Sequence, residues 1–210
     1  MNHSAMEIVI SPTSALPKQT KPPKRMYLPI VDRSIQDENK SALLRRWNFV
    51  STDLANDIRV CQQWFPGQRV LLEMLTVLNE EQVLELADCG LPLFSIRTPI
   101  AAQNDSFDAH KPKDAFQAEA IEEVFMALIS RLDCLRTSPT QATMLFDLPS
   151  AQASLISRHS PRELHMIATD PAVVLLPTVA DEYFLIASTT QLTFKERTVL
   201  AGTARRKRAM

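Results

Sequence analysis

Two stretches of the chain carry apolar side chains at steps of three and four residues, the period of one face of an α-helix. In the first stretch, from Ser41 to about Trp64, these positions are Leu43, Leu44, Trp47, Val50, Leu54, Ile58 and Cys61. The second stretch opens at Asp114, which is suited to cap a helix, and its positions are Phe116, Ile121, Val124, Phe125, Leu128, Leu132 and Leu135. The pattern therefore predicts a long amphipathic helix in each half of the chain.

A shorter pattern also occurs twice. The segment 79–94 superposes without a gap on the segment 160–175, which lies 81 positions later. Each segment opens with a small polar residue followed three positions later by Gln or Glu, the signature of a capping box. Gly90 or Pro171 then ends the helix, and a short apolar run follows. We interpret the segments as copies of one unit, and the alternative is a chance likeness between two ordinary capped helices.

The order of the predicted elements divides the chain. Each half runs from a long helix through a short helix and a capped helix to an extended run, at 91–96 and at 172–176. The segments 183–188 and 191–200 indicate either one further strand and helix or packing for the tail. The predicted organisation is a Pro-rich disordered arm at 1–40, a first helical unit at 41–97, a linker at 98–113, a second unit at 114–194 and a basic tail at 195–210.

A unit of this size is too small to bury a wide apolar face by itself. We therefore predict a mostly α fold in which the two tandem helical units pack as an internal pseudo-dimer, the covalent counterpart of a symmetric homodimer. Side-by-side packing without symmetry is the alternative, and periodicity alone does not separate the two.

Composition narrows the classes of function. The 210 residues are 45% hydrophobic, which is ample for a packed core. No apolar run approaches the roughly 20 residues that span a bilayer and no signal-peptide pattern opens the chain, so we expect a cytoplasmic protein. Three glycines are too few for a dinucleotide fingerprint or a P-loop. Three cysteines without a C-x-x-C pair argue against a disulfide framework and a zinc site, and buried small side chains are their expected role.

The formal net charge of -1 hides an uneven distribution. Residues 41–194 hold 11 Lys and Arg against 19 Asp and Glu, whereas residues 195–210 hold six against one. A body this acidic does not bind DNA tightly by itself, so contact with nucleic acid requires a partner that supplies phosphate contacts.

The chain shows no catalytic motif, and we predict no enzymatic activity, no cofactor and no metal site. His159 and His165 are six residues apart, which sets them on different faces of a helix and makes them a poor metal pair. Acidic pairs such as Glu80–Glu81 and Glu122–Glu123 are typical of solvated helix faces.

The run WFPGQRVLLEMLTVLNEEQVLELADCGLPLFSIR, residues 64–97, resembles the central part of FlhD, the small subunit of the bacterial flagellar transcription regulator. In that family a short helix, a capped helix and a strand-like run ending in an aromatic residue and an arginine follow in this order, and Phe94 and Arg97 match the ending. The run LFDLPSAQASLISRHSPRELHMIATDPAVVL, residues 145–175, resembles it more weakly and lacks the arginine. The ending ARRKRAM resembles the family's basic C-terminus. The family protein carries a single unit, and Cys89 lies near its interchain cysteine without matching the position.

The resemblance implies a mostly helical subunit of a transcription activator that assembles with a second, FlhC-like subunit, which carries the zinc site and most of the contact with promoter DNA. A helical adaptor or chaperone-like module that binds one protein and no DNA is the alternative. The candidate residues for partner contact, all on the apolar faces of the two long helices, are Trp47, Leu54, Ile58, Trp64, Phe125, Leu128 and Leu132.

The two short helices of each unit have helix-turn-helix spacing, with turns at 77–79 and 158–160. The first pair would expose Glu80, Glu81 and Glu85, which phosphates repel, so only the second pair is chemically suited to DNA. A helical hairpin inside a core is the alternative meaning of this spacing. The predicted DNA contacts are Arg158, His159, Arg162 and His165 of the second pair and Arg205, Arg206, Lys207 and Arg208 of the tail.

Overall fold

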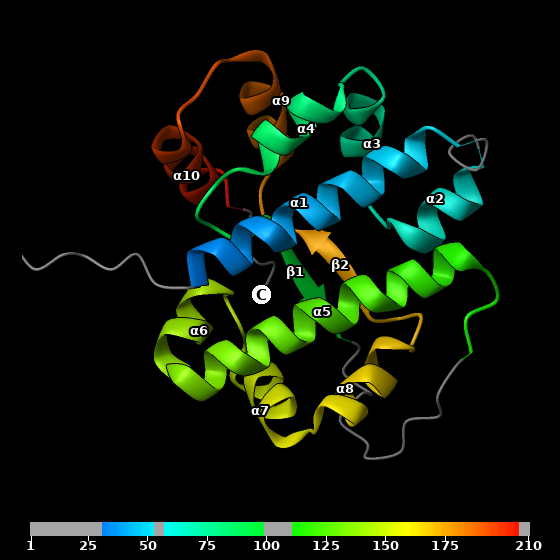
Figure 1. The fold of residues 1–210 in the computed structure, drawn as a ribbon, viewed down its shortest axis with the longest axis vertical. Coiled ribbons are helices and arrows are strands. Elements are labelled where there is room, and N and C mark those ends of the chain that lie inside the picture. The colour runs from blue at the N-terminus through cyan, green and yellow to red at the C-terminus, as the bar shows by residue number, and fades with distance from the viewer. Residues whose placement is uncertain (1–30, 53–56, 99–110, 206–210) are drawn as a thin grey trace, which may run out of the picture.

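The computed structural model describes residues 31–52, 57–98 and 111–205 (Figure 1). Its helices are α1 (Val31–Val50), α2 (Ile58–Trp64), α3 (Arg69–Leu75), α4 (Glu80–Ala87), α5 (Ala115–Thr137), α6 (Pro139–Leu145), α7 (Ser150–Arg158), α8 (Pro161–Ala168), α9 (Asp181–Thr189) and α10 (Phe194–Thr203). The strands are β1 (Phe94–Arg97) and β2 (Val174–Pro177). The predicted mostly α fold is confirmed. None of the helices in these ranges combines the length and the apolar character needed to cross a bilayer.

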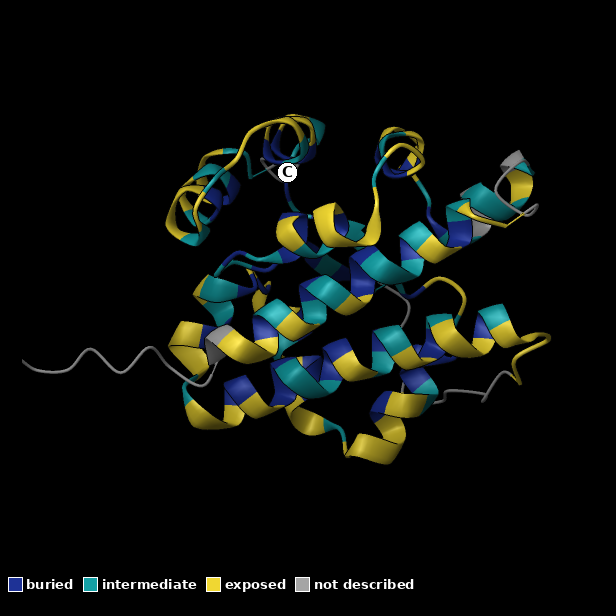
Figure 2. Ribbon diagram, turned by 45° about the horizontal axis from the view of Figure 1, so that its top comes forward, coloured by how far each residue is buried: buried dark blue, intermediate teal, exposed yellow. Residues whose placement is uncertain are grey.

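Helices α1 and α5 lie side by side at the centre of the molecule, with the two strands behind them (Figure 1). β1 and β2 pair antiparallel, with Phe94 opposite Pro177 and Ile96 opposite Leu175. In this view α3, α4, α9 and α10 lie above the central layer, and α6, α7 and α8 lie below it. Figure 2 shows buried positions turned toward the middle of the molecule and exposed positions on the outward sides of the helices. A single large apolar core therefore spans both halves of the chain.

Several helix starts follow polar signals in the sequence. Asn79 and Ser160 begin α4 and α8 with complete capping boxes, as predicted. The side chain of Asp114 accepts the amide hydrogen of Gln117 at the start of α5, and a third capping box at Thr193 starts α10. The extended runs predicted after α4 and α8 contribute the two strands.

The arm boundary predicted at residue 40 is wrong, because α1 begins at Val31. Ile35 is buried in this helix, and so is Asn39. The Asn39 side chain accepts the amide hydrogen of Leu93 and donates to the carbonyl of Leu91. These two partners belong to the segment that leads into β1, so the local sequence around Asn39 gives no sign of its burial.

The single long helix predicted from 41 to 64 is also wrong. α1 ends at Val50, and α2 begins separately at Ile58, where the Asp57 side chain accepts the amide hydrogen of Arg59 and caps the new helix. Much of the predicted tail at 195–210 is α10 rather than an extended basic segment. The alternative of a strand at 183–188 is excluded as well, because these residues lie within α9.

The element order repeats along the chain. α2, α3 and α4 begin 81 positions before α6, α7 and α8, respectively. The interpretation of the two halves as copies of one unit stays a prediction. The side-chain contacts between α1 and α5 show how the halves are joined.

Buried ion pairs cross between α1 and α5. Arg46 of α1 donates through Nη1 to Glu123 of α5 at 2.6 Å and to the carbonyl of Ala42 at 2.7 Å, and through Nη2 to the carbonyl of Leu175 in β2 at 3.4 Å. Its guanidinium also lies 4.9 Å from the centroid of the Phe65 ring. Burial lowers the pKa of Arg46, and the neighbouring Glu123 carboxylate opposes this shift by stabilising the charged form.

Arg131 of α5 makes equivalent contacts with residues of the first half of the chain. Its Nη1 donates to Glu38 of α1 and to the carbonyl of Ala127, both at 2.8 Å, and its Nη2 donates to the carbonyl of Phe94 in β1 at 3.1 Å. The guanidinium lies 4.5 Å from the centroid of the Phe146 ring. Each arginine therefore binds a helix and a strand that belong to the other half of the chain.

Arg45 differs from these two arginines. It also pairs with Glu123, and its guanidinium lies between the rings of Phe65 and Phe116, at 5.1 and 5.4 Å from their centroids. Among the described residues, two of its buried donors, Nε and Nη2, have no hydrogen-bond partner, whereas Arg131 leaves one donor, Nε, without a partner. Unmet donors in the interior reduce the net stabilisation that a buried charge gives.

Replacing Arg131 with methionine leaves the Glu38 carboxylate and the Phe94 carbonyl buried without their donor. We expect the free energy of unfolding, measured by urea denaturation, to fall by about 3–5 kcal/mol. The control is Arg45→Met, for which we expect the free energy of unfolding to fall by less than about 1.5 kcal/mol. In this variant Glu123 still pairs with Arg46, and the two Arg45 donors that have no hydrogen-bond partner are removed. Equal losses for the two variants would contradict the special role of the crossed pairs.

Replacing Asn79 with alanine removes the side-chain acceptor that caps α4. We expect a loss of about 1 kcal/mol in the free energy of unfolding in the same assay. Ser157→Ala, at an exposed position that caps no helix, should stay within about 0.5 kcal/mol of the parent protein. A cost for Asn79→Ala no larger than that of the control would show that the capping box is dispensable.

Candidate nucleic-acid interface

α7 and α8 form a helix pair joined by two residues, with α8 packed against α5. The apolar side of α8 is buried, and the opposite side exposes Arg162 and His165. These two residues are three positions apart, so they lie on the same face of the helix. The His165 ring meets the Phe125 ring of α5 edge-on, with 5.1 Å between the centroids. This aromatic contact holds the outer face of α8 in a fixed position relative to α5.

The other two candidates of this pair differ from each other. Arg158 ends α7 and is exposed, and its Nε donates to the carbonyl of Ser154 at 3.2 Å. His159 is half-buried, and its Nδ1 lies 2.6 Å from the carbonyl oxygen of Leu155. The structure therefore brings Arg158 to the same exposed helix pair as Arg162 and His165 and turns His159 back onto α7.

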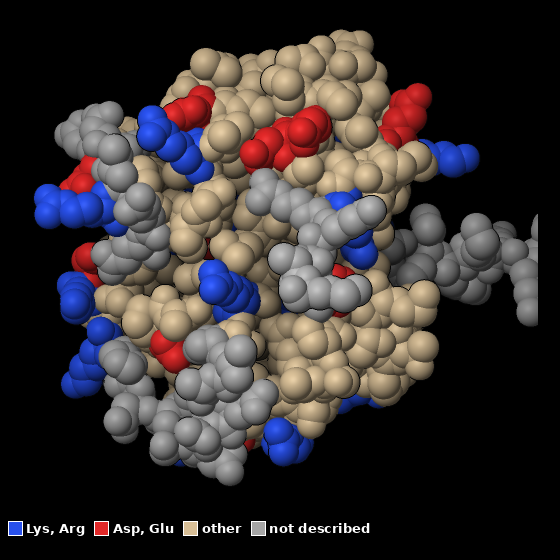
Figure 3. All heavy atoms as spheres, turned by 180° about the vertical axis from the view of Figure 1, so that it is seen from behind, with Lys and Arg blue, Asp and Glu red and all other residues tan. Residues whose placement is uncertain are grey.

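The corresponding pair in the first half, α3 and α4, has the opposite charge. α4 exposes Glu80, Glu81 and Glu85 and contains no basic residue. α7 and α8 contain Arg158 and Arg162 against one acidic residue, Glu163. Figure 3 shows the back of the molecule, where basic and acidic side chains lie in small separate groups and form no continuous basic surface over the described residues. On this face the positive charge of the described residues therefore lies in small separate groups (Figure 3).

Glu163 belongs to the cap of α8 rather than to a binding surface. Its carboxylate accepts the amide and hydroxyl hydrogens of Ser160, at 2.7 and 2.8 Å. These hydrogen bonds lower the pKa of Glu163, so it stays ionised at neutral pH. Its negative charge offsets part of the attraction that Arg162 offers to a phosphate.

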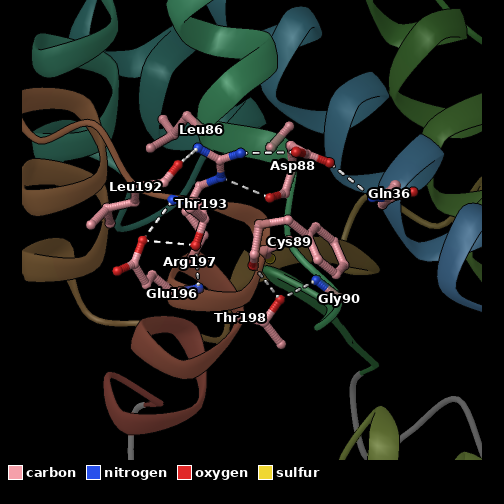
Figure 4. Close-up of polar contacts among 12 residues, drawn as sticks. Gln36, Leu86, Asp88, Cys89, Gly90, Leu192, Thr193, Glu196, Arg197 and Thr198 are labelled. Atoms are coloured by element: carbon pink, nitrogen blue, oxygen red, sulfur yellow. Dashed lines mark hydrogen bonds and ion pairs between the residues drawn. The ribbon is translucent and has the colours of Figure 1, made fainter.

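The basic C-terminal segment follows α10, which polar contacts fix against the end of α4 (Figure 4). Arg197 donates to the Asp88 carbonyl and, through Nη2, to the Asp88 carboxylate, both at 2.8 Å. The other oxygen of that carboxylate accepts from Gln36 of α1 at 2.8 Å. The amide of Gly90 donates to the hydroxyl of Thr198 at 2.9 Å. α10 is therefore part of the folded body, and it fixes the point from which the basic segment leaves.

The four tail candidates do not share one environment. Arg205 is half-buried: its Nη2 donates to the carbonyl of Leu145 at the end of α6 at 2.8 Å, and its backbone bridges to Val179. Its guanidinium is thus used within the chain. Arg206, Lys207 and Arg208 lie outside the described residues.

The candidates for partner contact differ in how far they are buried. Leu128 and Leu132 are wrong as partner contacts, because both are buried in the core of the chain itself. Trp47, Trp64 and Phe125 are half-buried. Leu54 and the side chain of Ile58 lie outside the described part of the structure.

Among the half-buried aromatic residues, Trp47 donates through Nε1 to the carbonyl of Leu78 at 2.8 Å, which fixes it beside the turn between α3 and α4. Trp64 packs edge-on against Phe116, with 6.3 Å between the ring centroids. Trp47 therefore reaches the α3–α4 pair, whereas Phe125 reaches the α7–α8 pair through its contact with His165.

A groove between α1 and α5, about 860 Å³ in volume, was not predicted from the sequence. Five of its lining residues are acidic, against Arg33 and Arg45, and Leu44 and Met126 supply apolar surface. Two of the carboxylates, those of Glu38 and Glu123, bind the crossed arginines. Local sequence gives no signal for such a groove, because it arises only when the two long helices pack together.

The cysteine environments disfavour thiolate chemistry. Cys89 and Cys134 are buried, as predicted, and burial raises the pKa of both thiols and of Cys61. Within 31–52, 57–98 and 111–205, no three His, Cys, Asp or Glu side chains gather in a way that could hold a metal ion.

No family model matches the sequence, and neither a curated protein nor a solved structure matches it.

Replacing Arg197 with glutamine removes the two-point contact with Asp88. We expect faster hydrogen exchange of the α10 amides, because the helix opens locally when its anchor is lost, while α7 keeps its protection. Hydrogen-exchange mass spectrometry measures both helices in one experiment. Lys195→Gln, at an exposed position of the same helix, should leave exchange unchanged. Unchanged protection of α10 in the Arg197 variant would show that apolar packing alone holds this helix.

Proposed function

We propose that the protein is an FlhD-like subunit of a transcription regulator, which touches promoter DNA through α7, α8 and the basic C-terminal segment. A second, FlhC-like, zinc-binding protein supplies most of the binding free energy. The observation that carries this proposal is the difference in exposed charge between two helix pairs at equivalent places in the chain. α8 offers Arg162 and His165, whereas α4 offers glutamates.

The charge of α7 and α8 supports a contact with phosphate. Arg158 and Arg162 are exposed near the turn of the pair, on the side where the second helix of a helix-turn-helix begins. Arginine is suited to this task because its planar guanidinium binds phosphate oxygens with two hydrogen bonds. The exposed imidazole of His165 adds a donor at the same face.

The same surface is too small for tight binding by this chain alone. Each phosphate contact contributes about 0.9 to the slope of log affinity against log salt concentration, and proteins that bind DNA tightly make several such contacts. Two exposed arginines beside an ionised Glu163 fall short of that number. The acidic α3–α4 pair on the other side of the molecule repels phosphate, so a partner is required.

The alternative function is a helical adaptor that binds a protein and never touches DNA. The acidic body favours it, since residues 41–194 hold 11 Lys and Arg against 19 Asp and Glu. Both functions require a protein partner. Only the first predicts that replacing the arginines of α7 and α8 weakens the binding of the complex to DNA.

The test uses the complex purified from native cells through a tag on this chain, with the DNA fragments that it retains. We expect the double variant Arg158→Ala, Arg162→Ala to weaken binding to these fragments in fluorescence anisotropy. The slope of log affinity against log salt should fall by about 1 to 2 if each arginine meets one phosphate. Recovery of a partner without enriched DNA would favour the adaptor.

The control is Arg69→Ala, which removes an exposed arginine from α3, at the other helix pair. Its affinity and salt slope should match those of the parent complex. An equal decrease for both exchanges would show that general charge, and not the α7–α8 surface, governs the affinity.

A further inference from the structure

An exposed apolar ridge runs along α3. Val70 and Val77 are 56% and 78% exposed, and the half-buried Met74 lies between them. Val70 and Met74 are four residues apart and lie on one side of α3, and Val77 follows in the turn after the helix ends. Neither valine belongs to the buried core, so burial does not explain why these two positions are apolar.

α9 extends this ridge. The hydroxyl of Ser188 lies 3.7 Å from the sulfur of Met74, which brings the two helices into contact. Leu185 lies one helical turn before Ser188, on the same side of α9, and is 58% exposed. We call Val70, Met74, Val77 and Leu185 the α3–α9 ridge. Trp47 borders its end, because its indole donates to the carbonyl of Leu78.

The helix α7, which lies 81 positions after α3, has no such row of exposed apolar side chains. The positions 81 residues after Val70, Met74 and Val77 are Ala151, Leu155 and Arg158. Leu155 is buried, and Arg158 is exposed and charged. The exposed apolar positions of α3 and its following turn therefore have no counterpart in α7, although single apolar side chains such as Met144 are exposed elsewhere in the second half.

Acidic side chains accompany the ridge residues in the sequence. Glu80 and Glu81 follow Val77 and are exposed at the start of α4, and Asp181 and Glu182 precede Leu185 by one turn of α9. Glu73, also exposed on α3, is paired with Arg69 at 2.7 Å. Exposed carboxylates of α4 and α9, those of Glu80, Glu81 and Glu182, therefore lie close in the chain to the apolar residues of the ridge, and we call these carboxylates the rim.

This combination decides what the ridge can bind. Phosphates of nucleic acid are repelled by the rim. A second copy joined through the same surface would place the two acidic rims against each other, which opposes a symmetric dimer. A helix with an apolar stripe flanked by Lys and Arg satisfies both the centre and the rim.

We propose that the α3–α9 ridge binds a basic amphipathic helix of a partner protein. The apolar stripe of that helix covers Val70, Val77 and Leu185, and its flanking cations meet the carboxylates of α4 and α9. The inference rests on the proposed function in one respect, the expectation of a protein partner. It assigns this contact to the side of the molecule that lies away from α7 and α8 (Figure 1).

The test uses fluorescently labelled helical peptides of about 18 residues, a length that covers five turns, and measures their binding to the whole chain by anisotropy. One set has a stripe of Leu, Met or Phe flanked by Lys, and a matched set has Glu in place of Lys. We expect binding by the cationic set only. We expect Val77→Ser and Leu185→Ser to weaken it about tenfold each, because each removes one apolar anchor.

Met126→Ser and Val199→Ser are the matched controls, since these residues are 55% and 60% exposed on other helices. They should leave the affinity within about twofold. Failure of every cationic peptide to bind, equal binding of the anionic set, or equal losses for all four variants would overturn the proposal. No DNA enters this assay, so its failure leaves the role of Arg158 and Arg162 untouched, and loss of DNA binding leaves the ridge untouched.

Discussion

The rest of the structure depends on two buried arginines that cross between the halves of the chain. A buried charge is tolerated only where an opposite charge and hydrogen-bond acceptors meet it, since its removal from water costs several kcal/mol. Arg46 and Arg131 satisfy this condition because each reaches a glutamate on the neighbouring helix and a carbonyl on the far strand. A shift of α1 along α5 would break both sets together. The register of the helices and the position of the two strands are therefore fixed by one requirement.

The outer helices, which lie around the central pair α1 and α5, differ in the charge and apolar character that they expose. α3 and α4 lie on one side of the central layer and α7 and α8 on the other (Figure 1). The first pair is acidic beside an apolar ridge, and the second exposes arginines and an imidazole. A molecule with two different surfaces on opposite sides can hold two different partners at once. The role that we propose, a subunit that links a protein to DNA, would use both surfaces.

The sequence predicts structure well where the interactions that form it join residues close together in the chain. Both capping boxes were found from a polar residue and a Gln or Glu three positions later, because these groups bond to each other within one turn. Asn39 and Arg131 have their partners far along the chain, so the local pattern gives no sign that they are buried. The same limit applies to Leu128 and Leu132, since periodicity marks an apolar face without saying whether the chain itself or a partner covers it. The candidate DNA contacts in α7 and α8 were found from charge, whereas the ridge needed α9 in place.

The attachment of α10 has a consequence for how the protein is made. α10 closes over the end of α4, where Arg197 holds Asp88 and Thr198 receives the amide of Gly90. These contacts join residues more than 100 positions apart, as the separations of 108 and 109 residues show. Ribosomes add roughly 5–20 residues each second, so several seconds pass between the synthesis of α4 and that of α10. During this interval Asp88 and Gly90 lack their contacts with α10, so the end of α4 is completed only after the C-terminal helix has been made.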